Sequence, residues 1–263
     1  MPERERLDYS NGLDPHVLEP KYSAALRSIW CIPNKVKGIS ATRKYIMENC
    51  KTRYLLMLDD DMKFFHRPDM TKPKLNMLHN GNIGPTLLNT WYNLCKGVGM
   101  TGYYKNGCAH VGLSARQGNN HYSDPLEPNY RMMNAYMYDL KKVLLPKIEL
   151  GRVPVMEDFD LTLQLLRAGI PNVVMFDYCW NQIGSGFEGG CSSYRTAKVQ
   201  EAAAKKLAKL HPGFVRVVQK QVKTPGWWQG MQTRYDVRVD WKKAYASSQK
   251  NGLVPFPREQ HAN

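Results

Sequence analysis

Long apolar segments are missing from this sequence. Its apolar runs are only a handful of residues long, far short of the roughly 20 that a membrane-spanning helix needs. The opening residues, Met1 to Arg6, lack the apolar centre of a secretory signal. We therefore expect a globular protein of the cytoplasm that does not insert into a membrane.

Closely spaced cysteine pairs are missing as well. Zinc sites need closely spaced ligands, and disulfide frameworks belong mainly to small secreted domains. Here six cysteines are scattered along 263 residues, at Cys31, Cys50, Cys95, Cys108, Cys179 and Cys191. This distribution predicts reduced thiols and argues against a structural zinc site.

Acidic residues are few compared with basic ones. The chain has 23 Asp and Glu against 37 Lys and Arg, which gives a formal net charge of +14. Such an excess indicates a polyanionic partner, with nucleic acid the first candidate and an anionic membrane surface the second. Plain solubility is the alternative explanation.

Apolar runs alternate with segments of helical spacing, which predicts an α/β fold with a mainly parallel sheet flanked by helices. Predicted strands cover residues 28–32, 54–58, 110–114, 130–136 and 173–176. Predicted helices cover residues 41–48 (capped by Ser40), 85–95, 158–168 and 196–210. We expect one domain over residues 1–220 and a basic, aromatic extension over residues 221–263.

Three consecutive aspartates, Asp59, Asp60 and Asp61, directly follow the predicted strand at 54–58. Like charges this close raise one another's pKa unless a cation or hydrogen-bond donors neutralise them. Alternation along a strand directs Asp59 and Asp61 to one face, where both can bind one Mg²⁺ or Mn²⁺. A solvated acidic turn is the alternative.

A second acidic group, formed by Glu157, Asp158 and Asp160, opens the predicted helix at 158–168. A carboxylate in this place can take a proton from an attacking hydroxyl group. The alternative is structural, because helix N-termini favour acidic residues as caps and as partners of the helix dipole. This motif alone leaves the choice open.

Together the two acidic groups resemble the GT-A glycosyltransferases, in which a DxD motif ends a strand and an ED pair opens a later helix. The sequence has YLLMLDDD at residues 54–61, preceded by GISATR at 38–43, and MEDFDLTL at 156–163. The resemblance implies a GT-A-like fold, a divalent metal (Mn²⁺ or Mg²⁺) and a nucleoside-diphosphate sugar, for which we expect a UDP-sugar.

More narrowly, the chain resembles the phage TET-associated glycosyltransferases from about residue 29 to about residue 220. The matching motifs are VGLSARQGNN at 111–120, the Glu157-Asp158 pair, GGC at 189–191 with Arg195, and HPGFV at 211–215. Members of that family are proposed to attach sugars to 5-hydroxymethylcytosine in phage DNA. The resemblance thus implies DNA as acceptor, in agreement with the positive charge, and the bacterial host cytoplasm as the location.

Carried over residue by residue, the resemblance implies Asp59 and Asp61 at the metal, Asp60 near the donor ribose, and Asp158 as the catalytic base with Glu157 beside it. The implied donor-binding residues are Arg43, Gly189, Gly190 and Arg195. A tight glycine turn and a solvated arginine are the alternatives for the last three.

Two features depart from the GT-A pattern. Only 58 residues precede Asp59, so we expect the N-terminal nucleotide-binding part to be shortened. At the place where many GT-A enzymes have a metal-binding histidine, the sequence has WNQ at 180–182, which leaves Asn181, Asp177 or water as the third ligand.

Several polar and aromatic side chains are candidate contacts to the acceptor, although loops often carry such residues for no special reason. They are Arg116, Gln117, Asn119, Asn120, Trp180 and Asn181. The tryptophans Trp227, Trp228 and Trp241 either stack on a base or sugar or cover the core.

The sequence therefore predicts an inverting, metal-dependent transfer in which Asp158 deprotonates the acceptor hydroxyl and the metal stabilises the departing nucleoside diphosphate. The first alternative is a GT-A enzyme that acts on a glycan or protein. The second is a non-catalytic basic protein that binds nucleic acid. A metal-dependent nuclease or phosphotransferase is disfavoured by the ED helix and the absence of a P-loop.

Overall fold

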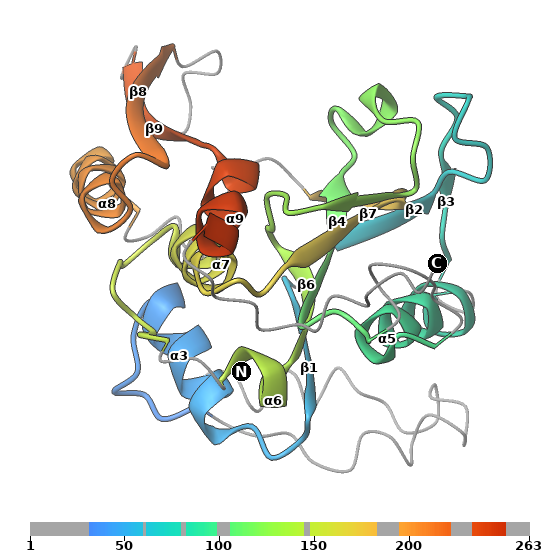
Figure 1. The fold of residues 1–263 in the computed structure, drawn as a ribbon, viewed down its shortest axis with the longest axis horizontal. Coiled ribbons are helices and arrows are strands. Elements are labelled where there is room, and N and C mark those ends of the chain that lie inside the picture. The colour runs from blue at the N-terminus through green and yellow to red at the C-terminus, as the bar shows by residue number, and fades with distance from the viewer. Residues whose placement is uncertain are drawn as a thin grey trace.

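A computed structural model describes residues 32–59, 62–79, 83–98, 106–144, 148–182, 195–221 and 233–250. Over these segments the chain is a mixed α/β structure with helices on both faces of a central sheet (Figure 1). None of their helices is both long enough and apolar enough to cross a bilayer. The strand predicted at 28–32 lies outside the described residues except for Ile32.

The central sheet is mainly antiparallel. It contains β1 (Tyr54–Leu58), β2 (Met62–His66), β3 (Asn76–Met77), β4 (His110–Ala115), β5 (Leu126–Pro128), β6 (Ala135–Asp139) and β7 (Asn172–Gln182). The order is β1-β6-β4-β7-β2-β3, with β5 paired to β7. Among these strands β4 and β7 pair in parallel, and the other pairings are antiparallel. The mixed α/β class is confirmed, but the expected mainly parallel sheet is wrong.

Burial on both faces explains the error. In β7, Val173 and Met175 face one core cluster, whereas Val174 and Phe176 face another. An unbroken apolar run is typical of parallel strands because helices cover both of their faces. An antiparallel strand that helices cover on both faces has the same sequence pattern, so the pattern alone does not give strand direction.

Six α-helices are described: α3 (Ile39–Asn49), α5 (Asn89–Lys96), α6 (Leu140–Val143), α7 (Glu157–Arg167), α8 (Ala197–Leu210) and α9 (Trp241–Lys250). The helices predicted at 41–48, 158–168 and 196–210 are confirmed within two residues at each end. The predicted cap is wrong, because α3 begins after Gly38, whose φ is 84°, and Ser40 is buried in its first turn. The strand predicted at 130–136 is instead β6, which begins at Ala135.

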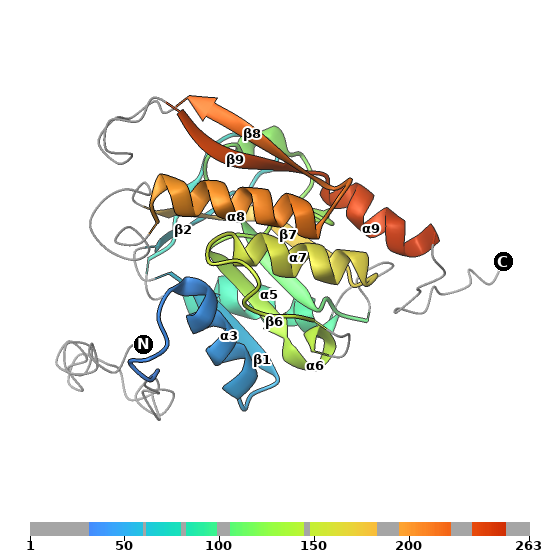
Figure 2. The same ribbon diagram turned by 90° about the vertical axis from the view of Figure 1, so that its left-hand side faces the viewer.

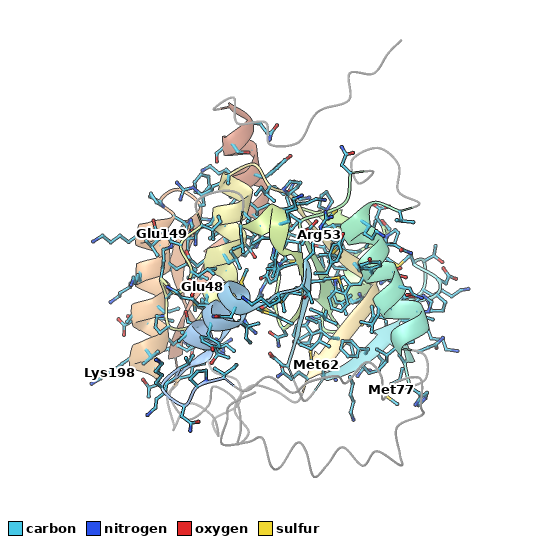
Figure 3. All side chains as sticks on the ribbon, turned by 90° about the horizontal axis from the view of Figure 1, so that it is seen from below. Glu48, Arg53, Met62, Met77, Glu149 and Lys198 are labelled. Atoms are coloured by element: carbon cyan, nitrogen blue, oxygen red, sulfur yellow. The ribbon has the colours of Figure 1, made fainter. Side chains whose placement is uncertain are left out.

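The helices form layers around the sheet. The π-helical turn Ile83–Leu88 and α5 cover one face, and α3, α6 and α7 cover the other. Figure 3 shows Glu48 of α3 and Lys198 of α8 on one side of the molecule and Met77 of β3 on the other.

A third core cluster lies outside α7. The hairpin of β8 (Val215–Gln221) and β9 (Thr233–Val239) lies along α8 in Figure 2, and both pack with α7 and α9. Trp241 of α9 contacts Phe159 of α7 edge to face at 5.3 Å, as the core-covering alternative requires. Trp227 and Trp228 lie outside the described residues. The first turn of α7 is therefore held between the sheet and an outer layer.

Candidate active site

The two acidic motifs of the sequence meet beside α3. Asp59 directly follows β1, and Glu157 is the first residue of α7. Arg43 of α3 links them, because its Nη1 donates to Glu157 Oε1 at 2.5 Å and its Nη2 to Asp59 Oδ1 at 3.4 Å. Two motifs about a hundred residues apart in sequence thus contact the same guanidinium group.

Gln182 and Asn134 border the same site, and the sequence analysis missed both. Gln182 ends β7, and its Nε2 lies 3.5 Å from Asp59 Oδ2. Its Oε1 accepts a hydrogen bond of 2.5 Å from Asn134 Nδ2. Gln182 belongs to the WNQ segment that takes the place of a metal-binding histidine, and this position was the signal that could have found it. Asn134 carries no comparable signal.

Glu157 is the strongly perturbed acid of the site. Burial raises its pKa to about 7, against the opposing effect of Arg43. Burial alone would lower the pKa of Arg43, but Tyr136, Glu157 and two aspartates raise it well above its ordinary value. Arg43 therefore stays charged, and Glu157 can gain or lose a proton near neutral pH.

Asp158 has an environment unlike that of a helix cap. Its Oδ1 accepts a hydrogen bond of 2.9 Å from the adjacent Phe159 N, and the N-cap position is Met156, which provides no side-chain hydrogen bond. A cavity of about 20 Å³ borders Asp158, Glu157 and Ser40. It has room for about one water molecule and none for a sugar ring.

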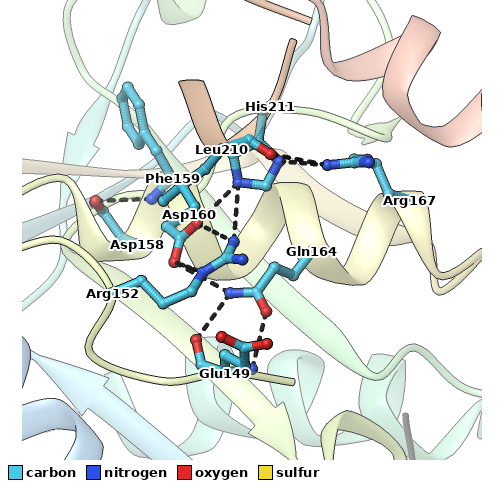
Figure 4. Close-up of polar contacts among 9 residues, drawn as sticks. All are labelled: Glu149, Arg152, Asp158, Phe159, Asp160, Gln164, Arg167, Leu210 and His211. Carbon is cyan, nitrogen blue, oxygen red and sulfur yellow. Dashed lines mark hydrogen bonds and ion pairs between the residues drawn. The ribbon is translucent and has the colours of Figure 1, made fainter. Parts of the chain in front are cut away.

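Asp160 belongs to a buried polar network instead (Figure 4). Arg152 binds its carboxylate through two nitrogens, at 3.0 and 2.5 Å, and His211 Nε2 lies 2.8 Å from its Oδ1. Gln164 donates to Asp160 Oδ2 at 3.1 Å and to the Glu149 carbonyl at 3.0 Å. The network ties the first turn of α7 to the end of α8 and to the 149–152 segment.

His211, the first residue of the HPGFV motif, lies at the C-terminal end of α8. Its ring is fully buried, and Arg167 Nη1 lies 3.1 Å from its Nδ1. The other ring nitrogen, Nε2, lies 3.2 Å from Arg152 Nη2 and 2.8 Å from Asp160 Oδ1. The ring is therefore held between two arginines and the Asp160 carboxylate.

The predicted donor-binding residues are only partly described. Asp60, Asp61, Gly189 and Gly190 lie outside the described residues. Arg195 precedes α8 and is close enough to Glu157 to lower the pKa of that carboxyl group. Its Nε is buried without a hydrogen-bond partner. Arg43 and Arg195 therefore both place positive charge beside the ED pair.

The predicted acceptor residues fall into two groups. Arg116, Gln117 and Asn120 are exposed on the loop after β4, and Asn181 is half-buried on β7. Asn119 is 1% exposed and donates to Ser114 Oγ at 2.6 Å and to the Phe176 carbonyl at 2.7 Å. Trp180 is also buried, with its Nε1 donating to the Leu113 carbonyl at 3.2 Å. The geometry gives these last two side chains a structural role.

Buried Arg67 holds the same loop. Its guanidinium donates to the backbone carbonyl of Asn119 at 2.9 Å and to that of Tyr122. Asp177 lies nearby, in the bulge where β7 shifts register against β4, and burial raises its pKa to about 6. Gln182, at the end of β7, lies beside Asp59, and Asp177 precedes it by five residues, which corresponds to about 16 Å along a strand. Asp177 is therefore badly placed to bind the same metal ion as Asp59.

Backbone strain marks the site from two sides. Asn134 and Met156 have φ values of 60° and 64°, in the left-handed region that side chains other than glycine rarely adopt. Asn134 contacts Gln182, and Met156 is the N-cap of the helix that begins with Glu157. Such a conformation persists where the surrounding structure holds it, as it also does at Asn129, which has a φ of 54° and does not belong to the candidate site.

Comparison with known proteins identifies the family of the chain. A family model described as TET-Associated Glycosyltransferase matches residues 17–186, more than half of the chain. The chain therefore belongs to the TET-associated glycosyltransferase family.

Two phage proteins are similar over most of their length. The beta-glucosyl-HMC-alpha-glucosyl-transferase of Enterobacteria phage T6 is 26% identical over 225 residues, which cover 79% of this chain and 76% of the phage protein. The protein of the same name from Enterobacteria phage T2 is 26% identical over 219 residues, with the same coverage. No solved structure matches the chain.

Proposed function

We propose that this protein transfers a sugar from a nucleoside-diphosphate sugar to 5-hydroxymethylcytosine, or to a related modified base, in phage DNA. The observation that carries the proposal is the Arg43 bridge, which brings Asp59 together with the ED pair of α7. The net charge of +14 and the names of the phage relatives support DNA as acceptor.

Asp158 is the proposed catalytic base. Its carboxylate lies at the start of α7, beside Glu157 and the two arginines. It takes the proton of the acceptor hydroxyl as the oxygen attacks the anomeric carbon of the sugar. Arg43 and Arg195 supply positive charge for the phosphates of the departing nucleoside diphosphate.

Asp59 and Asp61 are the proposed ligands of a divalent cation. Asp59 supplies carboxylate oxygens, the ligand type that suits Mg²⁺ or Mn²⁺, whereas Gln182 turns its amide nitrogen toward that carboxylate and its oxygen accepts from Asn134. Arg43 Nη2 and Gln182 Nε2 lie 3.4 and 3.5 Å from oxygens of the Asp59 carboxylate, at the long end of hydrogen bonding. When bound, the cation would neutralise charge on the leaving diphosphate.

The stereochemistry of the product tests the role of Asp158. A single displacement with Asp158 as base inverts the anomeric configuration of the donor. The phage relatives are named for alpha-glucosyl transfer. An alpha product forms with inversion from a beta-configured donor and with retention from an alpha-configured one, so donor and product anomers have to be determined together by NMR coupling constants.

The direct test incubates the protein with Mn²⁺ or Mg²⁺, a panel of nucleotide sugars and three duplexes. These carry cytosine, hydroxymethylcytosine or beta-glucosyl-hydroxymethylcytosine. After digestion to nucleosides, mass spectrometry should show one added sugar on a modified base and none on cytosine. Transfer to a glycan or protein acceptor, without any transfer to either modified duplex, would contradict the proposal and support the first alternative.

A further inference from the structure

The β8–β9 hairpin has one apolar and one basic face. Val215 and Val237 face the core cluster shared with α7 and α8. Successive residues of a strand face opposite sides, so the residues adjacent to these valines in the strands point away from α8. They are Arg216, Val218, Lys220, Arg234, Asp236 and Arg238, which we call the outer hairpin face.

Basic residues on the outer hairpin face lie directly opposite one another. Arg216 pairs with Arg238 in the strand register, and Lys220 pairs with Arg234. Like charges in such cross-strand pairs destabilise a sheet. Asp236 offsets one pair, with its Oδ2 at 2.6 Å from Lys220 Nζ and 3.7 Å from an Arg234 nitrogen.

The other pair has no such compensation. Neither Arg216 nor Arg238 forms an ion pair with a carboxylate of the described residues, and both side chains are exposed. Two unbalanced arginines on adjacent strands lower the stability of the hairpin unless they bind an anion. This makes them the part of the face that a partner would engage first.

The outer hairpin face continues toward the candidate active site through Arg131. The Arg131 guanidinium lies 4.8 Å from the ring centre of Phe159, the residue that follows Asp158. The charges close enough to act on its pKa include Asp158 of α7 and Asp236 and Arg234 of the hairpin. Positive charge therefore extends from the hairpin to the proposed catalytic base.

We propose that the outer hairpin face binds the phosphate backbone of duplex DNA while an acceptor base lies at Asp158. The inference rests on the proposed function, which supplies DNA as the acceptor. The two basic pairs of this face lie four residues apart along the hairpin, about 13 Å, and the two members of each pair lie on adjacent strands. The face therefore presents positive charge at two separated points, and Arg and Lys side chains are usual partners of phosphate oxygens in protein–DNA contacts.

The test compares two double variants with equal charge loss. Arg216→Gln/Arg238→Gln removes the uncompensated pair. Lys51→Gln/Lys141→Gln removes two exposed lysines that border a hollow at the α6 end of the molecule, away from the hairpin in Figures 1 and 2. Binding to a fluorescent duplex is measured from 50 to 300 mM salt, with thermal unfolding of each protein in parallel.

We expect the hairpin variant to bind DNA roughly tenfold more weakly at about 0.1 M salt and to lose about 2 from the slope of log K against log salt concentration. Its melting temperature should stay the same or rise, because the like-charge pair is gone. The lysine variant should keep the wild-type slope. Equal slopes for wild type and the hairpin variant would overturn the inference.

Two further results keep this inference separate from the proposed function. If wild type transfers sugar to modified DNA but the hairpin variant binds DNA normally, only the inference fails. If wild type transfers no sugar to either modified duplex, the proposed function fails. The inference would also be overturned if the protein bound vesicles containing anionic phosphatidylserine through this face in preference to duplex DNA.

Discussion

The helices α7 and α8 contribute to the same core cluster but begin in opposite ways. α8 begins with a conventional cap, because Thr196 Oγ1 accepts a hydrogen bond of 3.3 Å from Val199 N, and its first turn has no acidic residue. α7 begins after a left-handed Met156, has no side-chain cap and carries three acidic residues in its first turn. The start of α8 is stabilised by a side-chain cap, whereas the carboxylates at the start of α7 do not cap their helix and contact other groups.

The acidic residues of α7 divide further between two tasks. Asp160 is enclosed by Arg152, His211 and Gln164, so its carboxylate is fully occupied within the protein. Glu157 and Asp158 face Arg43 and the small cavity instead. The contrast teaches that Asp160 fixes the position of the helix start, and it leaves Asp158 as the candidate base of the proposed function.

Replacing Asp158 should produce the largest effect on activity. Asp158→Asn removes the proposed base without changing side-chain size, so we expect the rate constant for transfer to fall by about 10³-fold. Binding of the nucleoside diphosphate should persist, since Arg43 and Arg195 remain. Transfer kinetics and calorimetric titration with the nucleoside diphosphate and Mn²⁺ measure the two quantities.

The control for this variant is Asp69→Asn, which removes the same charge from the loop between β2 and β3. It should transfer sugar at nearly the wild-type rate. If Asp158→Asn and Asp69→Asn were equally active, Asp158 would not be the base, and the contrast within α7 would disappear.

Replacing Asp160 should affect stability more than chemistry. Asp160→Asn leaves Arg152 and His211 without a buried anion, which should cost about 3 kcal/mol in the free energy of unfolding. Burial acts to raise the pKa of Asp160, but His211 and Arg152 hold it below its ordinary value. The stabilisation is therefore present above the unfolded-state pKa and disappears as pH falls through the folded-state pKa.

Urea unfolding at pH 7 and at successively lower pH values measures this difference. The gap between wild type and Asp160→Asn should narrow as the medium becomes acidic. Glu201→Gln, which breaks an exposed pair with Lys205 on α8, is the matched control and should cost less than about 1 kcal/mol. A gap that stays constant with pH would mean that Asp160 does not act through its charge.

The sequence predicted best the parts that depend on local signals. The apolar spacing of α7 and α8 and the glycine after α7 gave their ends within two residues. The apolar run at 54–58 gave β1 without error. These features depend on residues close together in the chain, so their periodicity and end signals were sufficient.

The features that depend on distant residues could not be predicted in this way. Strand direction failed because both sheet faces are covered. The Asp160 network joins residues 152, 160 and 211, and the contact of Gln182 with Asp59 joins two strand ends more than a hundred residues apart. Nothing in the local sequence distinguishes Asp160 from Asp158, and the packing of α8 and of the 149–152 segment against α7 gives Asp160 its partners.

Glu157 should change the stability of the protein with pH in the opposite direction to Asp160. Its folded-state pKa of about 7 lies above the unfolded-state value, so its contribution to stability decreases as pH rises from about 4.5 to 7. Glu157→Gln should therefore gain stability relative to wild type over this range, on the order of 2–3 kcal/mol. Urea unfolding at pH 5 and pH 8 gives the comparison.

Glu48→Gln, on the exposed side of α3, controls for the loss of one carboxylate and should remain within about 0.5 kcal/mol of wild type. If Glu157→Gln instead lost stability relative to wild type as pH rises, the effect of Arg43 on the pKa of Glu157 would outweigh the effect of burial. The pH dependences of Glu157 and Asp160 would then have the same sign.

The smallest effect is expected at the start of α8. Thr196→Ala removes the cap and should lower the free energy of unfolding by about 1 kcal/mol, while Thr196→Ser retains the capping oxygen and should cost little. Transfer per folded molecule should be nearly unchanged in both variants, because the Thr196 hydroxyl caps the helix and the neighbouring Arg195 is retained. A large loss of transfer in Thr196→Ala with the fold intact would assign the capping hydroxyl itself to the site, and the distinction between the two helix caps would fail.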